Sequence, residues 1–354
     1  MKQVRISTLL LLLLLLFACA FPLLFPNPAV TSIAVFTLLS AASTTGWNIF
    51  SGYTGYISLG HATFFGMGAY TLAIVCQDWN IQGGPIPFLL LPLSGLVACA
   101  CAVPAGWIAL RVRGNTFVII TIALFFSFQL LASNLHSVTN GSVGMNLPAP
   151  TWNGDGFNTP FYAVSLALLL LALGVSWWVR TSKYGLGLLA IRDDEDRARS
   201  LGVRTGAFKL GAYVLSALFA GIAGGIYAYF VGSIYPQFAF DPTFDVAITL
   251  MAFLGGLGTL WGPVVGALLV VPLQQSLTLQ FGANGLDQIV YGLLFLFILL
   301  VLPEGIVPSL QQRWVKWMAQ RRSKAPGIER TSHGAVPNML PERLGASPRK
   351  GEKR

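Results

Sequence analysis

The stretch from Leu210 to Val231 reads LGAYVLSALFAGIAGGIYAYFV and contains no charged residue. A helix of about 20 apolar residues is long enough to cross a hydrocarbon core of roughly 30 Å. Because lipid offers no partner for backbone amides, such a run is predicted to be a helix and not a strand. Similar runs are Thr8 to Phe25, Ala29 to Phe50, the glycine-rich Ile57 to Cys76, Ile86 to Leu110, Thr116 to Ser133, Phe161 to Val179, Val246 to Leu279 and Gln288 to Leu302. The predicted fold class is all-α, a polytopic integral membrane protein.

The composition supports this prediction. Of the 354 residues, 55% are hydrophobic and only 10% are charged, whereas an ordinary soluble domain has about 25% charged residues. One globular core of this size could not hide so much apolar surface from water. An ordinary soluble enzyme or binding domain is therefore excluded.

The basic residues predict the orientation of the helices. All 22 Lys and Arg residues fall into four places: Lys2 and Arg5, Arg111 and Arg113, seven from Arg180 to Lys209, and eleven from Arg313 to the end. The links 133–160 and 232–245 contain acidic residues and no basic ones. By the positive-inside rule, the four basic clusters face the cytoplasm. We expect both termini on the cytoplasmic side of the membrane.

The first run has a competing interpretation. Its leucines and the following Ala18-Cys19-Ala20 resemble a secretory signal, and residues 16–19 loosely resemble a lipoprotein cleavage site. Phe17 fits such a site poorly. Four crossings between Arg5 and Arg111 return the chain to the cytoplasm, and removal of the first helix would leave three. An uncleaved helix is the better prediction.

The parity of the membrane crossings, that is, whether their number is odd or even, also bears on the run from Val246 to Leu279. This run is too long for one helix. From the outer link around Asp241 to the basic tail, the chain needs an odd number of crossings. Proline and glycine weaken a helix, so a break is expected between Gly255 and Pro263. Either a down-and-back pair of helices or a re-entrant segment there restores the parity. The total is then about eight to ten membrane segments.

The predicted domains are a transmembrane domain, residues 1–308, and a basic tail, residues 309–354. From Arg313 onward the tail has eleven basic and three acidic residues. It is rich in Pro, Gly and Ser, and we expect it to be disordered and cytoplasmic. Trp314 and Trp317 among basic residues favour contact with anionic membrane lipid. Because the positive charge belongs to this tail, no nucleic-acid partner is expected.

Two glycine-rich breaks are the main functional signal. The first runs from Ser51 to Tyr70 and the second from Gly255 to Ala267. Close helix packing alone is the competing explanation for each glycine. Unpaired backbone at membrane depth, however, is tolerated only inside protein or along a water-filled path. The broken-helix glycines are Gly52, Gly55, Gly60, Gly255, Gly256, Gly258 and Gly262.

Four stretches resemble a known family. SGYTGYISLGHATFFGMGAY (51–70), SKYGLGLLAIRDDEDRARSLGV (182–203), KLGAYVLSALFAGIAGGIYA (209–228) and LGGLGTLWGPVVGALL (254–269) are similar to signature stretches of LivM-type permeases of branched-chain amino acid ABC importers. Urea and short-chain amide permeases of the same superfamily have similar stretches, so the cargo stays open. The resemblance implies a second, LivH-like permease, two cytoplasmic ATPase subunits and an external solute-binding protein as partners.

The energy source and reaction class follow from absent motifs. No G-x-x-x-x-G-K-[ST] stretch occurs, so the sequence predicts a transport subunit without its own ATPase site. An ion-coupled secondary transporter is the alternative, but the apolar runs contain no Asp or Glu, and His61 is their one titratable group near a run centre. An integral membrane enzyme is disfavoured because no His, Cys or carboxylate cluster has ligand spacing. We expect no cofactor, no metal and no catalytic residue.

Candidate path residues are the neutral polar side chains near the breaks and on the fifth helix: Ser58, His61, Thr63, Thr121, Ser127, Gln129, Thr259 and Trp261. A cytoplasmic coupling segment is expected at about 180–209, with one short helix from Leu186 to Gly202 that docks on the ATPase. Pairs four residues apart, Asp193 with Arg197 and Glu195 with Arg199, favour that helix. The predicted coupling residues are Arg192, Asp193, Asp194, Glu195, Asp196, Arg197, Leu201 and Gly202. Charge swaps at Asp194 and Glu195 are expected to leave folding nearly intact.

Overall fold

A computed structural model describes residues 16–152, 154, 156–281, 292–293, 296 and 305–310. The chain divides into two compact units, residues 1–311 and 312–354, and the described residues all belong to the first. The predicted basic tail from Arg313 and most of the predicted helix from Gln288 to Leu302 lie outside the described residues.

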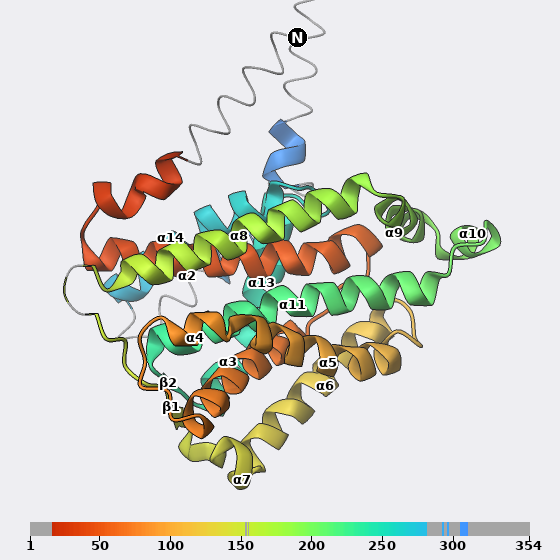
Figure 1. The fold of residues 1–354 in the computed structure, drawn as a ribbon. Helices are drawn as coiled ribbons and strands as arrows, with labels where there is room; N and C mark the ends of the chain where they lie inside the picture. The colour runs from red at the N-terminus through yellow and green to blue at the C-terminus, as the bar shows by residue number, and fades with distance from the viewer. Residues whose placement is uncertain are drawn as a thin grey trace, which may run out of the picture. The chain divides into compact units, whose positions relative to one another are not determined.

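Helices make up nearly all of the described structure, which confirms the all-α fold class (Figure 1). A helix at residues 16–24 comes first. The long helices are α2 (Pro28–Trp47), α3 (His61–Asp78), α5 (Leu91–Ala109), α6 (Asn115–Asn134), α8 (Asn158–Thr181), α11 (Thr205–Val231), α13 (Pro242–Gly255) and α14 (Gly262–Phe281). The short ones are π-helical η1 (Asn48–Gly52), α4 (Ile86–Leu89), α7 (His136–Thr139), 3-10 helical η2 (Gly141–Val143), α9 (Lys183–Asp193), α10 (Glu195–Ser200) and α12 (Pro236–Ala239). Strands β1 (Met145–Asn146) and β2 (Ser233–Ile234) form one small antiparallel pair.

Six helical segments among the described residues are long and apolar enough to cross a membrane: Pro28–Gly52, Ile86–Ala109, Asn115–Asn134, Asn158–Thr181, Thr205–Val231 and Pro236–Gly255. The first five correspond to runs predicted from the sequence, whereas the sixth begins in the predicted outer link and overlaps the predicted run from Val246 only over residues 246–255. α3 and α14 add two further apolar helices. The chain is therefore a multi-pass membrane protein.

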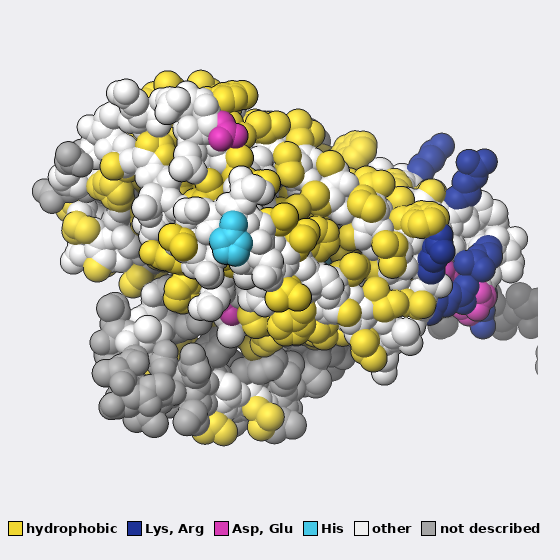
Figure 2. Space-filling view, turned by 90° about the horizontal axis from the view of Figure 1, so that it is seen from below, with side chains coloured by type: hydrophobic (Ala, Val, Ile, Leu, Met, Phe, Trp, Pro, Cys, Tyr) yellow, Lys and Arg dark blue, Asp and Glu magenta, His cyan; other side chains and the backbone are white. Residues whose placement is uncertain are grey.

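The described Lys and Arg residues gather at one end of the helices, which we name the basic end. Figure 2 shows them there together with acidic side chains, whereas apolar and uncharged groups cover the adjoining surface. The links after α5 and between α8 and α11 meet at this end, because Arg113 pairs with Asp196 at 2.9 Å. The sequence prediction that the internal basic clusters lie on one side is confirmed for the described residues.

α11 is the central helix of the bundle, since it packs against α3, α5, α2 and α8. The contact with α3 is backbone to backbone. A Cβ atom at Gly68 would collide with the carbonyl of Gly221, and one at Gly224 with the carbonyl of Phe65. Small residues let helices in lipid approach this closely, where dispersion and not hydrophobic burial drives association.

The second glycine-rich break is a turn between two packed helices. α13 and α14 pack on each other, and Gly255 lies against the carbonyl of Gly262. The turn lies at the basic end, because Gly258 contacts the Arg192 side chain. Of the two predicted arrangements, the structure thus contains the down-and-back pair and not a re-entrant segment at Gly255 to Pro263.

The crossing that leads through α13 to the basic end is interrupted. Residues 232–241 turn back into the bundle, so that the Phe240 ring packs on Gly66. Gly66 lies 12 residues before the end of α3, about 18 Å along its axis. α13 has 14 residues, a length of about 21 Å, which is shorter than a crossing of roughly 30 Å. The helix therefore starts inside the bundle, which the sequence analysis did not predict.

Candidate functional site

The first glycine-rich break separates α2 from α3. α2 runs on into η1, and eight residues, 53–60, lie between the end of η1 and the start of α3. Such single π-helical turns are frequent at functional sites. Gly60 closes the break, and a Cβ atom there would meet the Thr121 carbonyl of α6 at 2.6 Å. The Leu59 N–H donates to Thr121 Oγ1 at 3.2 Å. The break is thus held against α6 by backbone contacts that need glycine.

His61, fully buried at the first position of α3, organises the polar groups of this break. Its Nε2 lies 2.7 Å from Ser216 Oγ, and its Nδ1 lies 3.1 Å from Ser58 Oγ. Because the Ser216 hydroxyl already donates to the Tyr213 carbonyl, Nε2–H is the donor to Ser216. Nδ1 then accepts from Ser58. The pattern fits a neutral imidazole with both nitrogens occupied, a structural arrangement that leaves no free nitrogen for proton transfer.

A carboxylate that the sequence analysis had assigned to an outer link lies beside His61. Asp245, in the first turn of α13, is 3% exposed, and its Oδ1 accepts from the Ala62 N–H at 2.9 Å. Asp245 thereby caps α3, a contact favoured by the positive end of the helix dipole. The first turns of two helices that start inside the bundle, α3 and α13, meet at this contact.

The other predicted path residues fall into three places. Thr63 and Thr121 are buried around the first break, and Gln129 donates from α6 to the Phe240 carbonyl at 2.7 Å. Ser127 lies on an exposed face of α6 and bonds only the Ala123 carbonyl of its own helix. Thr259 and Trp261 lie in the turn at the basic end, which packs on the Gly52 end of the first break. The structure therefore groups Ser58, His61, Thr63, Thr121 and Gln129, and places Ser127, Thr259 and Trp261 elsewhere.

Thr259 shapes the turn between α13 and α14. Its hydroxyl donates to the Gly256 carbonyl and accepts from the Gly262 N–H, at 2.7 and 3.0 Å. Fully buried Asn48, at the start of η1, clamps the same turn. It accepts from the Gly258 N–H at 2.8 Å and donates to the Thr259 carbonyl at 3.0 Å. The two glycine-rich breaks are thus joined through Asn48. Sequence reasoning overlooked this residue, although an amide in an apolar run was the available signal.

The predicted coupling segment forms two helices and not one. Asp194 leaves the helical conformation and caps α10, accepting from the Asp196 and Arg197 N–H groups at 3.0 Å each. The chain therefore changes direction between α9 and α10. The predicted pair of Glu195 with Arg199 is present at 3.5 Å, and Arg197 pairs with Asp194 at 3.0 Å. The predicted helix end at Gly202 is confirmed, because this residue has φ +87 just after α10.

Glu195 is the centre of a polar cluster and not a surface charge. Its side chain is 9% exposed and pairs with the 3% exposed Lys209 of α11 at 2.9 Å. The Tyr56 hydroxyl of the first break donates to the same carboxylate, and Arg113 lies 3.8 Å away. Burial by itself raises the pKa of Glu195, but the bonds from Lys209 and Tyr56 and the nearby positive charges hold that pKa below its ordinary value. Glu195 therefore links the coupling segment, α11 and the first break.

This environment corrects the expectation about charge swaps. A lysine in place of Glu195 would put two ammonium groups into one largely buried site, and replacement of Asp194 would remove the cap of α10. Removing one partner of a buried ion pair costs several kcal/mol, about 3 to 5. Exposed Asp193, Arg197 and Leu201 remain surface residues of the coupling segment.

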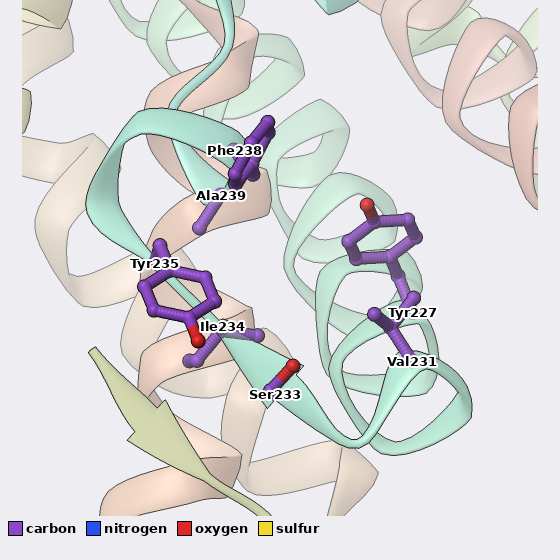
Figure 3. Close-up of a pocket in the computed structure, with 7 residues that line it drawn as sticks. All are labelled: Tyr227, Val231, Ser233, Ile234, Tyr235, Phe238 and Ala239. Atoms are coloured by element: carbon purple, nitrogen blue, oxygen red, sulfur yellow. The ribbon is translucent and has the colours of Figure 1, made fainter. Parts of the chain in front are cut away.

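A cavity of about 200 Å³ opens toward the end opposite the basic end. Figure 3 shows side chains of α11 facing those of residues 233–239 across it. Its lining is aromatic and aliphatic apart from a serine and two tyrosine hydroxyls: Tyr227, Val231, Ser233, Ile234, Tyr235, Phe238 and Ala239. The segment that lines it leads directly into α13 and Asp245.

The comparisons with known proteins agree on one family. A family model described as the branched-chain amino acid transport system permease component matches residues 29–299. The chain is 30% identical to LivM, the high-affinity branched-chain amino acid permease protein of Salmonella typhimurium, over 84% of this chain and 74% of that protein. It is 24% identical to LivH of Escherichia coli, over 74% and 89%. It is 25% identical to the autoinducer 2 import permease LsrC of Yersinia pseudotuberculosis, over 73% and 78%. No solved structure matches.

Proposed function

The chain belongs to the family of branched-chain amino acid transport permease components, and we propose that it is the membrane-spanning subunit of an ATP-driven importer for these amino acids. The family match confirms the resemblance seen in the four sequence stretches. We place the protein in the bacterial inner membrane with the basic end and both termini in the cytoplasm, because that orientation satisfies the positive-inside rule.

The observation that carries the proposal is the meeting of α3 and α13 inside the bundle. Transporters commonly hold their cargo where interrupted helices end near the middle of the membrane, with helix termini and backbone groups as ligands. The Ala62 N–H and Asp245 form such a meeting point, and buried serine and threonine hydroxyls surround it. Small neutral polar groups of this kind suit a zwitterionic cargo with an aliphatic side chain.

The energy source in this proposal is a pair of separate ATPase subunits. The coupling segment offers exposed Asp193, Arg197 and Leu201 as a docking surface at the basic end. A second, LivH-like permease and an external solute-binding protein complete the assembly. This chain is then a transport subunit without its own ATPase site, as its lack of a P-loop stretch suggests.

One observation keeps an ion-coupled transporter as a second candidate. Asp245 is a buried carboxylate inside the bundle, and intramembrane acids are typical of proton and sodium pathways. The sequence argument that the apolar segments lack acids therefore loses part of its force. The family match still favours ATP.

The cargo is tested by competition. Proteoliposomes that contain the full transporter should accumulate labelled leucine, and unlabelled isoleucine and valine should compete. Urea and acetamide should not compete even in large excess. Competition by urea or acetamide, without competition by valine, would assign the chain to amide transport instead.

A further inference from the structure

The junction of α3 and α13 contains buried polar atoms without partners. Among the described residues, nothing bonds Asp245 Oδ2, Thr63 Oγ1, Thr249 Oγ1 or Tyr70 Oη. Buried polar atoms in folded proteins are nearly always paired. Asp245 and Thr63 belong to the two helix turns that meet at the junction, so their unpaired atoms indicate a site that a ligand completes.

The unpaired atoms belong to α3 and α13, whose first turns meet. Thr63 and Tyr70 are seven residues apart on α3, and Asp245 and Thr249 are four apart on α13, so each pair shares a helix face. The Ala62 N–H bond to Asp245 joins the two helices next to Thr63. The Phe240 ring, stacked on Tyr70 with centroids 5.9 Å apart, closes the other side.

The unpaired oxygens at this junction favour a cation. Asp245 supplies a carboxylate oxygen that has no partner among the described residues, whereas both oxygens of Asp241 are held by Thr243. In the described part of the chain, all Lys and Arg residues lie at the basic end, and both nitrogens of His61 are occupied by serine hydroxyls.

We propose that this junction binds the α-ammonium group of an amino acid during its passage across the membrane. Asp245 Oδ2 supplies the ionic contact, and the hydroxyls of Thr63 and Thr249 accept the remaining ammonium hydrogens. An ammonium group has three donors and no acceptor, which matches this set of oxygens. A urea or amide molecule carries no charge and gains no ionic contact, so the site selects amino acids. This inference rests on the proposed function.

The test replaces Asp245 by Asn in the complete reconstituted transporter. The Asn amide oxygen can still accept from the Ala62 N–H, so the cap of α3 is kept while the negative charge is lost. We expect the KM for leucine to rise about tenfold or more, because a charge-assisted hydrogen bond is lost. Asp241→Asn is the matched control: both Asp241 oxygens are held by Thr243 at the start of the same helix, and its KM should stay within about twofold.

Thr249→Val covers the case in which the Asp245 variant does not assemble. Its hydroxyl has no partner among the described residues, so the fold should tolerate the change, whereas the KM should rise about threefold or more. A second readout uses thermal unfolding of the assembled transporter. Leucine should raise the Tm of the wild type, its 2-hydroxy analogue without the ammonium group should not, and the Asp245→Asn variant should lose the shift.

Three results would overturn the proposal. Unchanged kinetics in both the Asp245 and Thr249 variants would show that the junction does not hold the cargo. Equal Tm shifts from leucine and its 2-hydroxy analogue would show that the ammonium group is not recognised. An Asp245-dependent shift with sodium or potassium alone would assign an inorganic cation site. If the wild type moves leucine in these experiments, the proposed function stands while this inference fails; if it moves none, the proposed function itself has failed.

Discussion

The Nη1 atom of Arg192 lies 2.9 Å from the carbonyl oxygen of Gly52, which is 140 residues earlier in the chain. Arg192 is in the last turn of α9, and Gly52 is the last residue of η1. The same guanidinium contacts Gly258 in the turn between α13 and α14. One side chain of the coupling segment thus contacts both glycine-rich breaks. A movement of α9 would therefore displace a contact at each break.

Arg192→Met should therefore uncouple the transporter. The substitution keeps the apolar stem and removes the bond to Gly52, so the ATPase subunits should still assemble and hydrolyse ATP. We expect uptake per ATP hydrolysed to fall about tenfold, which would correspond to about 1.4 kcal/mol of lost coupling. The measurement is leucine uptake and phosphate release on one preparation. Lys183→Met, at the exposed start of α9, is the control and should keep the ratio. A normal ratio in the Arg192 variant would mean that this contact only shapes the loop.

Glu195→Gln should destabilise the transporter in a pH-dependent way. Lys209 would lose its ionic partner in a nearly buried position, at a cost of about 2 to 3 kcal/mol. Because the folded-state pKa of Glu195 is below its ordinary value of 4.5, the stabilisation is fully present above that value. It is lost as the pH falls through the lowered folded-state pKa.

Thermal unfolding at several pH values measures the stabilisation that the Glu195–Lys209 ion pair contributes. The Tm difference between the wild type and Glu195→Gln should be constant from about pH 8 to 5 and shrink below about pH 4. Asp196→Asn provides the control, since the Asp196 side chain is 75% exposed and should contribute less than about 1 kcal/mol. A Tm difference that grows toward acid pH would contradict the assigned ion pair.

Gly255→Ala should weaken the packing of α13 on α14. Its Cβ atom would collide with the Gly262 carbonyl, which belongs to rigid backbone. Overpacking of this kind costs about 1 to 3 kcal/mol, so the Tm should fall. Gly174→Ala on α8 has nothing within 4 Å of the new Cβ and should leave the Tm unchanged or slightly higher. Equal effects at the two positions would show that α13 and α14 are not in close contact.

Thiol labelling tests the orientation in the membrane. In a variant without Cys19, Cys76, Cys99 and Cys101, single cysteines can be placed at Val143 and at Leu201, which are 70% and 85% exposed. A membrane-impermeant reagent added to intact cells should label position 143 and leave position 201 unlabelled. The reverse pattern would place the basic end outside the cell and exclude docking of cytoplasmic ATPases there.

The sequence was sufficient for the helices and for their common basic end. Hydropathy indicates which segments prefer lipid to water, and the positive-inside rule required either a down-and-back pair or a re-entrant segment at Gly255 to Pro263. The sequence did not predict the contacts between polar residues that are far apart along the chain. Asp245 and Ala62 are 183 residues apart. Because Asp245 directly precedes an apolar run, the sequence analysis placed it in an outer link.

The coupling segment shows the same limit in another form. Its acids and bases fit one exposed helix, and four-residue spacing favoured that interpretation. Only the fold reveals that Asp194 interrupts the helix and that Glu195 turns inward to Lys209. Whether a charge is solvated or buried depends on the neighbouring helix, α11, and local spacing does not contain that information.

Uptake of labelled leucine by proteoliposomes of the complete transporter tests the central claim most directly. The solute-binding protein is supplied on one side, and ATP is supplied on the side of the basic end. The account predicts uptake that requires ATP, stops when the ATPase subunits are omitted, and continues after ionophores have collapsed the proton and sodium gradients. Uptake by this chain alone, driven by an imposed proton or sodium gradient and abolished by those ionophores, would contradict it.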